Sequence, residues 1–434
     1  MSEQYDAIII GSGIIGCCIG YEMAKKGYKP LNVDKLPAGL GSTANSCGII
    51  RTHYSTWDGA AIAYEGTLYW KNWEEYLGVK DELGFAKYIN TGCIIFKTEK
   101  NKCLKKVCEN LTDLSLEWED LTLEKIKEKM PLFDTHKFWP PRRPEDEQFW
   151  SEPSEFIDGA IFTPLAGYVN DPQLSCHNAQ RAAEVHGAAF RYSAEVIDIR
   201  KTNNRAQGIT LKNGEEIDAP IVVNVAGPNS FLINRMADVE KEMNIKTKAL
   251  RQEVCHVPSP EGFNYETDGY VASDSDIGCY SRPEVGNHIL IGSEDPDCDP
   301  LDFVDPDHYN KELTEAQWKA QVYRMAKRIP SLPIPNTFQG IVDLYDATDD
   351  WIPIYDKSDL DGFYMAVGTS GNQYKNAPVV GKLMTELIVQ CEAGTDHDAD
   401  PIQYTLDNIK RAIDLSFYSR KRKINPDSSF SVIG

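Results

Sequence analysis

The sequence lacks any apolar run near the roughly eighteen residues that a membrane-spanning helix needs. Asp6 interrupts the first apolar stretch, Tyr5–Ile10, and no secretory signal is expected. Positive charge is also scarce, because 45 Lys and Arg stand against 66 Asp and Glu, a formal net charge of −21. Nucleic acids and anionic membranes attract proteins that carry a positive face. The sequence therefore predicts no nucleic-acid partner and no membrane span.

The eleven cysteines include no Cys-x-x-Cys pair and no Cys and His cluster at zinc-binding spacing. We therefore expect reduced thiols, a cytoplasmic location and no bound metal. The composition, 41% apolar and 26% charged, is ordinary for a folded globular protein and excludes disorder along the whole chain. A length of 434 residues is enough for two or three domains or one large interleaved unit.

A nucleotide-binding pattern occupies the start of the chain. Residues Tyr5–Ile10 are expected to form a buried parallel strand, and the motif Gly11-Ser-Gly13-Ile-Ile-Gly16 follows directly. A helix is expected from Ile14 to Gly27, and a second strand, Pro30–Val33, ends at Asp34. Strand, tight turn, helix, strand and acid in this order are typical of a dinucleotide-binding unit.

The residues of this pattern have separate chemical roles. Gly11 permits the tight turn, Gly13 lets backbone amides approach a pyrophosphate, and Gly16 lets helix and strand pack closely. Asp34 can accept hydrogen bonds from the hydroxyls of an adenosine ribose. Only Lys35 is basic directly after Asp34, so a 2′-phosphate is not favoured. NAD and FAD both use this pattern, and the rest of the chain must distinguish them.

The next segment favours FAD. From Gly41 to Tyr54 the chain is rich in small residues, whereas a nicotinamide-binding domain would continue here with further strand and helix repeats. Small residues let the backbone pass close to a flat, bulky ligand such as an isoalloxazine ring. The segment therefore predicts a flavin as the ligand.

The middle of the chain is predicted to contain a β-meander. Val196–Arg200 and Gln207–Lys212 are expected strands, Asn213-Gly214 is typical of a type I′ hairpin turn, and a third strand is expected from Glu216 onward. A further strand, Ile221–Val225, is apolar throughout and ends at Ala226-Gly227. We expect this strand to be buried in the nucleotide-binding sheet.

Five segments together resemble the D-amino-acid oxidase and sarcosine oxidase family of FAD-dependent amine oxidoreductases. In chain order they are Gly11–Asp34, Gly41–Arg51, Tyr345–Ile354, Gly362–Lys375 and Pro378–Gly381. Within the family, the N-terminal half is most similar to the sarcosine oxidase β-subunit and dimethylglycine dehydrogenase branches. The resemblance covers most of the chain and is loose only between about residues 86 and 150.

The resemblance implies an α/β (α+β) fold, in which a Rossmann-like FAD-binding domain is interleaved with a substrate domain built on a mainly antiparallel sheet. The FAD-binding domain is expected to comprise residues 1–85, 150–232 and 335–395. The substrate domain is expected to comprise residues 86–149 and 233–334. Residues 396–434 are expected to form a C-terminal helix and tail, in which the basic run Arg420–Lys423 is solvated.

The resemblance also implies the cofactor, FAD, and the residues that surround it. These are Gly11, Gly13, Ile14, Ile15, Gly16, Asp34, Lys35, Gly41, Ser42, Thr43, Ser46, Cys47, Gly48, Ile49, Val196, Ala226, Gly227, Gly371, Asn372, Gln373, Tyr374 and Lys375. Branches that bind flavin covalently use a His within the Gly41 segment or a Cys just before the Tyr345 position. Asn45 and Asp343 stand at these places here, which predicts non-covalent FAD.

The implied reaction is oxidation of the C–N bond of a small secondary or tertiary amino acid, such as a sarcosine- or dimethylglycine-like N-methylated substrate. A hydride passes to flavin N5 and leaves an imine that water hydrolyses, which amounts to N-demethylation. Arg51 and Lys375 match the family positions that hold the substrate carboxylate. Tyr345 matches an aromatic residue at the substrate cavity, and Tyr280 and His53 are expected to line it.

Three questions remain open at the level of the sequence. The electron acceptor is oxygen or another acceptor, because Asp276 falls by a loose alignment where the monomeric sarcosine oxidases carry an oxygen-activating lysine. A 2-hydroxy acid or polyol dehydrogenase on the same fold is an alternative, with His53 or His256 as the base. The chain could also be the flavin-bearing subunit of a multi-component oxidase complex, and an oligomer is possible.

Overall fold

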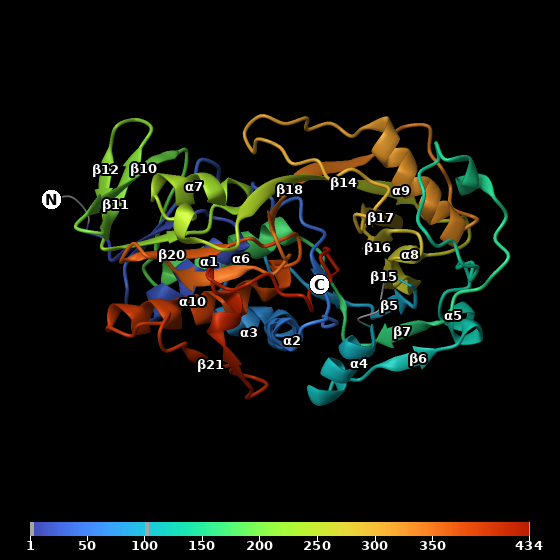
Figure 1. The fold of residues 1–434 in the computed structure, drawn as a ribbon, viewed down its shortest axis with the longest axis horizontal. Helices are drawn as coiled ribbons and strands as arrows, with labels where there is room; N and C mark the ends of the chain where they lie inside the picture. The colour runs from blue at the N-terminus through green and yellow to red at the C-terminus, as the bar shows by residue number, and fades with distance from the viewer. Residues whose placement is uncertain (1–3, 100–103, 434) are drawn as a thin grey trace.

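The computed structural model describes residues 4–99 and 104–433. Two lobes lie side by side along the long axis of the molecule (Figure 1). One lobe is built on a six-stranded sheet and the other on an eight-stranded sheet. The long paired strands β14 (Thr247–Pro258) and β18 (Gly340–Thr348) link the lobes at the top of the view.

The six-stranded sheet confirms the nucleotide-binding pattern. Its strand order is β19-β20-β13-β1-β2-β9, and all neighbours except β19 and β20 are parallel. The strands are β1 (Ala7–Ile10), β2 (Pro30–Val33), β9 (Ala189–Arg191), β13 (Ile221–Asn224), β19 (Ile354–Lys357) and β20 (Phe363–Val367). The apolar strand expected at Ile221–Val225 is β13, which pairs with β1.

This sheet is covered on both faces. Successive side chains of a strand point to opposite sides, and those of β1 enter two different cores. Ala7 and Ile9 of β1 belong to a core shared with helices, and Ile8 and Ile10 to a core shared with the meander. The helices are α1 (Ile14–Lys25), α2 (Trp57–Lys71), α3 (Trp73–Leu77), α6 (Pro172–Val185) and α10 (Ala377–Glu392). The meander is β10 (Val196–Thr202), β11 (Arg205–Leu211) and β12 (Glu216–Asp218), as expected.

The eight-stranded sheet is mainly antiparallel, with β15 and β5 as a parallel pair. Its order is β18-β14-β17-β16-β15-β5-β7-β6. The strands not yet given are β5 (Cys93–Phe96), β6 (Glu119–Leu121), β7 (Ala160–Thr163), β15 (Val271–Asp274), β16 (Cys279–Glu284) and β17 (His288–Ser293). The helices of this lobe and its border are α4 (Leu104–Asp113), α5 (Leu123–Lys129), α8 (Tyr265–Asp268) and α9 (Glu315–Arg328). Helix α7 (Ser230–Met236) belongs to the six-stranded lobe, where it packs with the meander (Figure 1). A small sheet joins the lobes, with β3 (Ile49–Ile50), β8 (Gly167–Val169) and β4 (Tyr88–Asn90).

Two proposed domain borders fall inside the eight-stranded sheet. β7 follows the border at residue 150 yet pairs with β5 and β6. β18 lies in the segment 335–395 yet pairs with β14. Strand pairing therefore moves these borders to positions after Thr163 and after Thr348. Both partners are distant in the sequence, so the pattern within one strand does not reveal them.

The expectation of a C-terminal helix is wrong for residues 396–433. The last α-helix ends at Glu392, and the chain continues as β21 (Gln403–Thr405), β22 (Ala412–Asp414) and the 3-10 helix η5 (Leu415–Tyr418). The prediction that the basic run is solvated is wrong for its two arginines, because Arg420 pairs with the buried Asp356 at 2.9 Å and Arg422 with the buried Asp350 at 2.7 Å, whereas Lys421 and Lys423 are exposed. These carboxylates dock the segment onto the six-stranded lobe.

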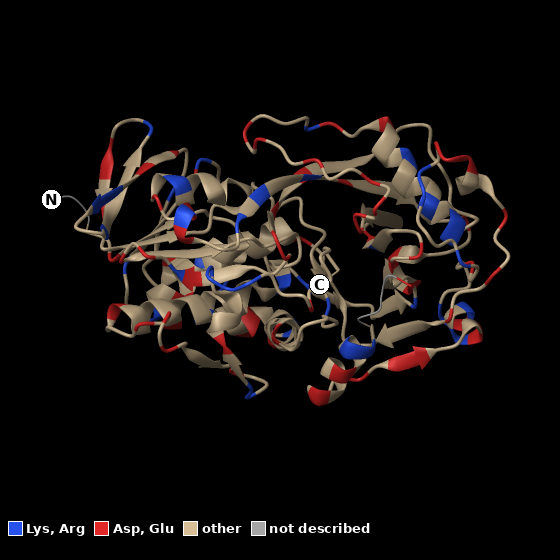
Figure 2. Cartoon of the chain, in the orientation of Figure 1, with Lys and Arg blue, Asp and Glu red and all other residues tan. Residues whose placement is uncertain are grey.

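Acidic and basic residues are interspersed along the chain in both lobes (Figure 2). Within residues 4–99 and 104–433, no helix is long and apolar enough to cross a membrane. Every cysteine in the same ranges is a free thiol.

Candidate active site

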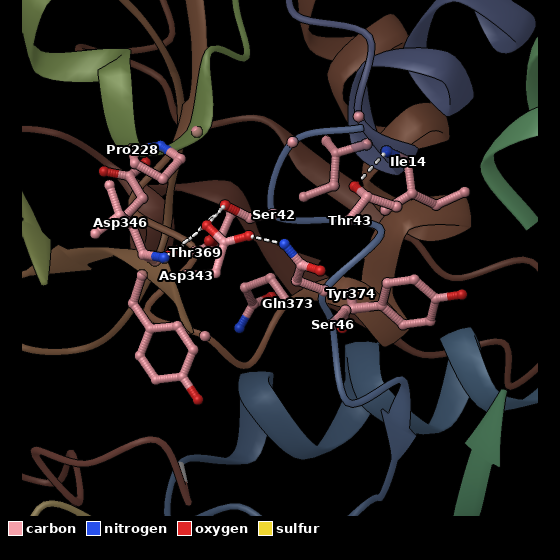
Figure 3. A pocket seen from close by; sticks show the side chains of 18 of the residues that line it. Ile14, Ser42, Thr43, Ser46, Pro228, Asp343, Asp346, Thr369, Gln373 and Tyr374 are labelled. Atoms are coloured by element: carbon pink, nitrogen blue, oxygen red, sulfur yellow. Dashed lines mark hydrogen bonds between the residues drawn. The ribbon is translucent and has the colours of Figure 1, made fainter. Parts of the chain in front are cut away.

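One large cavity lies beyond the carboxyl ends of β1, β2 and β13, between residues of both sheets. Its volume is about 760 Å³, and ends of parallel strands are the usual ligand positions in open α/β sheets. The site residues expected from the sequence all line it: Gly11, Gly13, Ile14, Ile15, Gly16, Asp34, Lys35, Gly41, Ser42, Thr43, Ser46, Cys47, Gly48, Ile49, Arg51, His53, Val196, Ala226, Gly227, Tyr280, Tyr345, Gly371, Asn372, Gln373, Tyr374 and Lys375. Figure 3 shows several of them around the cavity.

A glycine cradle borders the cavity where α1 begins. Gly11 has φ +120°, and a Cβ there would lie 2.2 Å from the Val225 carbonyl oxygen. A Cβ on Gly16 would lie 2.2 Å from the Gly11 carbonyl oxygen. The cap residue Gly13 offers no side chain to the helix, and the first turn carries no acid. Backbone amides at this end can therefore receive an anionic phosphate.

Asp34 is held at the end of β2 with its carboxylate fixed. The backbone amides of Ser12 and Leu36 donate to it at 2.7 and 2.8 Å. Burial raises the pKa of Asp34, although these amides favour the charged form. Lys35 is turned toward Asp307 of the other lobe, at 2.5 Å. The cradle and this acid fit the pyrophosphate and the ribose of a dinucleotide.

The two positions that carry covalent links in other branches meet in the structure. The Asn45 side-chain amide donates to the Asp343 carboxylate at 2.6 Å, and the Ser42 hydroxyl donates to the same carboxylate at 3.2 Å (Figure 3). Amides and carboxylates lack the nucleophilic sulfur or imidazole of those branches. A polar network therefore borders the cavity at this point.

Arg51 and Lys375 lie together at the cavity, both buried, with 7% and 2% of their surfaces exposed. The Arg51 guanidinium donates to the carbonyl oxygens of His53 and Val432 at 2.6 and 2.8 Å. The Lys375 ammonium donates to the carbonyl oxygen of Asn372. Both cations also lie against the Tyr54 ring, at 4.4 and 5.0 Å from its centroid.

This pair differs from the other buried cations in having no acid as a partner. Among the described residues, no carboxylate forms an ion pair with Arg51 or Lys375, whereas each of the remaining buried arginines has at least one: Arg282 with Glu284, Arg324 with Asp299, Arg328 with Asp274 and Asp276, and Arg420 with Asp356. Burial, with a contribution from Arg51, holds the pKa of Lys375 well below its usual value. An anionic ligand would supply the missing negative group.

His53 lies beside these cations and is uncharged. Burial lowers its pKa well below the usual value, and Arg51 and Lys375 lower it further. Neither ring nitrogen has a hydrogen-bond partner among the residues that the structure describes, although both are buried. A buried polar group without a partner is costly, so the ring is available to a ligand in the cavity.

Two tyrosines of the eight-stranded sheet, Tyr280 on β16 and Tyr345 on β18, line the cavity. The hydroxyls of Tyr280 and Tyr345 lie 3.4 Å apart, and the Cys47 sulfur lies 3.2 Å from the Tyr280 hydroxyl. Burial raises the pKa of both tyrosines and of the thiol, so all three stay uncharged. A Cβ on Gly371 would lie 2.5 Å from the Tyr345 ring, which explains a glycine at this close approach.

Two residues named from the sequence lie elsewhere. Asp276 does not line the cavity and instead pairs with Arg328 at 3.0 Å. The same segment presents Ser273 to the cavity, three positions earlier, because β15 ends before Asp276. His256 on β14 is likewise absent from the cavity lining. His53 is thus the one of the two proposed bases that faces the site.

The cavity is also lined by residues that were not predicted from the sequence, among them Asp346, Val432 and Ile433. Asp346 receives hydrogen bonds from the Gly368 amide at 2.6 Å and the Ser230 hydroxyl at 3.0 Å, and burial raises its pKa to about 7. Its place beside Tyr345 was a usable signal. Val432 and Ile433 also line the cavity. They follow a polar stretch without periodicity, and nothing local marked them.

The comparisons agree with this geometry. The sequence model of the family described as "FAD dependent oxidoreductase" matches residues 6–387. The chain therefore belongs to that family. It is 24% identical to a peroxisomal sarcosine oxidase of Homo sapiens, covering 91% of this chain and 94% of the relative. It is 22% identical to a glycine oxidase of Geobacillus kaustophilus, covering 91% and 96%.

A solved structure supports the fold. L-proline dehydrogenase from P. horikoshii superposes with a TM-score of 0.74 at 23% identity, covering 90% of this chain and 95% of that chain. The expected family, the mixed α/β fold and the assignment as a FAD-dependent oxidoreductase are thereby confirmed.

Proposed function

We propose that the protein oxidises the C–N bond of a small secondary or tertiary amino acid, such as a sarcosine- or dimethylglycine-like N-methylated substrate. The observation that carries the proposal is the buried pair of Arg51 and Lys375, which has no acidic partner within residues 4–99 and 104–433. The α-carboxylate of an amino acid supplies the missing charge. A simple amine would leave both cations unpaired in a low dielectric.

The chain's own residues would bind and orient the substrate. The Arg51 guanidinium has donors left for a carboxylate after its bonds to two carbonyl oxygens, and Lys375 adds a point charge. An unprotonated nitrogen of His53 can accept a hydrogen bond from the N–H of a secondary amine or of a protonated tertiary amine. Tyr280 and Tyr345 present aromatic surface to the same space. FAD, when bound, supplies the acceptor for the hydride.

The substrate class is tested by anaerobic bleaching of the bound flavin. A panel of N-methylated amino acids, the corresponding primary amino acids, 2-hydroxy acids and polyols is added to the FAD-loaded protein. We expect reduction by the N-methylated acids. Reduction only by hydroxy acids or polyols would reject C–N oxidation and favour a dehydrogenase that uses His53 as its base.

We further propose that FAD is held without a covalent bond. The support is the pair of Asn45 and Asp343 at the positions of covalent attachment in other branches. Precipitation of the holoprotein with acid should leave the flavin in the supernatant. Flavin that stays with the precipitated chain would overturn this proposal.

The acceptor is oxygen or another electron carrier, and the rate at which reduced flavin reoxidises in air-saturated buffer separates the two. Turnover by the isolated chain, measured together with its size in solution, separates a self-sufficient enzyme from a subunit of an oxidase complex. The free thiols of the described residues support a cytoplasmic location.

A further inference from the structure

Residues 431–433 enter the cavity from outside both sheets. The chain leaves η5 on the six-stranded lobe and reaches the space between the lobes, where the terminal label stands in Figure 1. Val432 and Ile433 line the cavity together with Arg51 and Tyr280. The family match ends at residue 387, so this part of the site lies outside it.

The segment is fixed at several points before it reaches the cavity. Arg422 pairs with Asp350 at 2.7 Å, and the Ser428 hydroxyl donates to the Asp350 carbonyl oxygen at 2.6 Å. Ser431 is 1% exposed, and its hydroxyl donates to the Glu294 carbonyl oxygen at 3.2 Å. One end of the segment is thus bonded to the six-stranded lobe and the other end to the eight-stranded lobe. Bonds at both ends are expected of a fixed part of the cavity wall.

Val432 contacts the site with both its backbone and its side chain. Its carbonyl oxygen accepts a hydrogen bond from Arg51, and its side chain packs with Val254, Tyr280 and Leu290. Ile433 is partly buried against the same cluster. A guanidinium has five N–H donors in a fixed plane, so the bond to Val432 sets the orientation in which the remaining donors meet a carboxylate.

We infer that residues 431–433 are a specificity-determining wall of the substrate compartment. The inference rests on the proposed function, because it places the substrate carboxylate on Arg51. The α-carbon of an amino acid is one bond from that carboxylate, so its substituent meets the apolar side chains beside Val432. The Val432 carbonyl positions Arg51, and the side chains of Val432 and Ile433 restrict the substrate to a small substituent.

The test uses ligand binding to the FAD-loaded protein, followed by flavin absorbance. Acetate has the carbon skeleton of glycine, and 4-methylpentanoate has that of leucine. Three variants are compared with the wild type: a chain that ends at Phe430, Ile433→Ala, and the control Ile424→Ala. Ile424 belongs to the same segment but is 54% exposed and does not line the cavity.

We expect the wild type and Ile424→Ala to prefer acetate by about tenfold or more, the usual effect of extra methylenes in a closed apolar pocket. The preference should shrink to about threefold or less in Ile433→Ala and in the shortened chain. The shortened chain should also bind acetate about two- to tenfold more weakly, because Arg51 loses one hydrogen bond that orients it. The Ile433→Ala chain keeps that carbonyl and should bind acetate as the wild type does.

The failures are distinguishable. If acetate does not perturb the wild-type flavin spectrum, the carboxylate site of the proposed function fails and this inference fails with it. If the wild type binds acetate but accepts 4-methylpentanoate equally well, or if Ile433→Ala keeps the wild-type preference, the wall is overturned while the proposed function stands.

Discussion

Replacing Lys375 with Met removes a buried cation and keeps a side chain of similar length. A charge-assisted hydrogen bond contributes about 1.5–3 kcal/mol. Acetate should therefore bind the FAD-loaded Lys375→Met chain roughly 10- to 100-fold more weakly. The same change should stabilise the protein without ligand, because the lysine is buried and has no acidic partner.

The stability effect has a defined sign. The folded pKa of Lys375 is lowered, so between that value and the ordinary lysine pKa the unfolded chain binds more protons than the folded one. The free energy of unfolding of the wild type therefore rises with pH across this window. Below the window, each unit by which the folded pKa lies under the unfolded pKa lowers that free energy by about 1.4 kcal/mol. The Lys375→Met chain should therefore have a higher free energy of unfolding at neutral pH than the wild type, and the gain should shrink as the pH approaches the pKa of free lysine.

Two assays on one variant decide the matter. Urea unfolding measures the stability, and flavin absorbance measures acetate affinity. The control is Lys382→Met. Lys382 lies on α10, forms an ion pair with Asp407 at 2.9 Å, and does not line the cavity. Unchanged acetate affinity in Lys375→Met, or a loss of stability larger than in Lys382→Met, would refute the reasoning.

Three further predictions follow from the same geometry. Acetate binding to the wild type should weaken about tenfold per pH unit above the lowered pKa of Lys375, because an anion favours its protonated form; a flat profile would contradict this. Asp34→Ala should weaken FAD binding about 10- to 100-fold, seen when the apoprotein is titrated with FAD; an unchanged affinity would remove the ribose role. Burial raises the pKa of Asp346 from 3.8 to about 7, so the stability from this group is present below about pH 4 and is lost as the pH rises through 7, up to about 4 kcal/mol. Asp346→Asn should abolish that decline in urea unfolding between pH 4 and 8, and a decline of wild-type size would contradict it.

The nucleotide-binding unit could be predicted from the sequence because its signals are local. Glycine spacing, an apolar strand and a terminal acid all lie within residues 5–34, and the structure places β1, α1 and β2 there. The meander was equally local, because short turns join its three consecutive strands. The domain borders have no such local signal. The sheet to which β7 and β18 belong is decided by pairing with β5 and β14, which are distant in the sequence.

The site shows the same division. Arg51 and Lys375 stand in motifs, and the structure brings them to one aromatic ring although they are far apart in the sequence. The bond between Arg51 and Val432 joins residues 381 positions apart and has no local signal. Asp276 was misplaced because an alignment loose by three positions exchanges a cavity residue, Ser273, for a buried ion pair.

The most direct test of the central claim is a crystal structure of the FAD-loaded protein with acetate. The account predicts the flavin pyrophosphate at the start of α1 and the acetate carboxylate about 3 Å from both the Arg51 guanidinium and the Lys375 ammonium, beside the ring. Acetate bound elsewhere, with Arg51 and Lys375 paired to carboxylates of the protein itself, would contradict it.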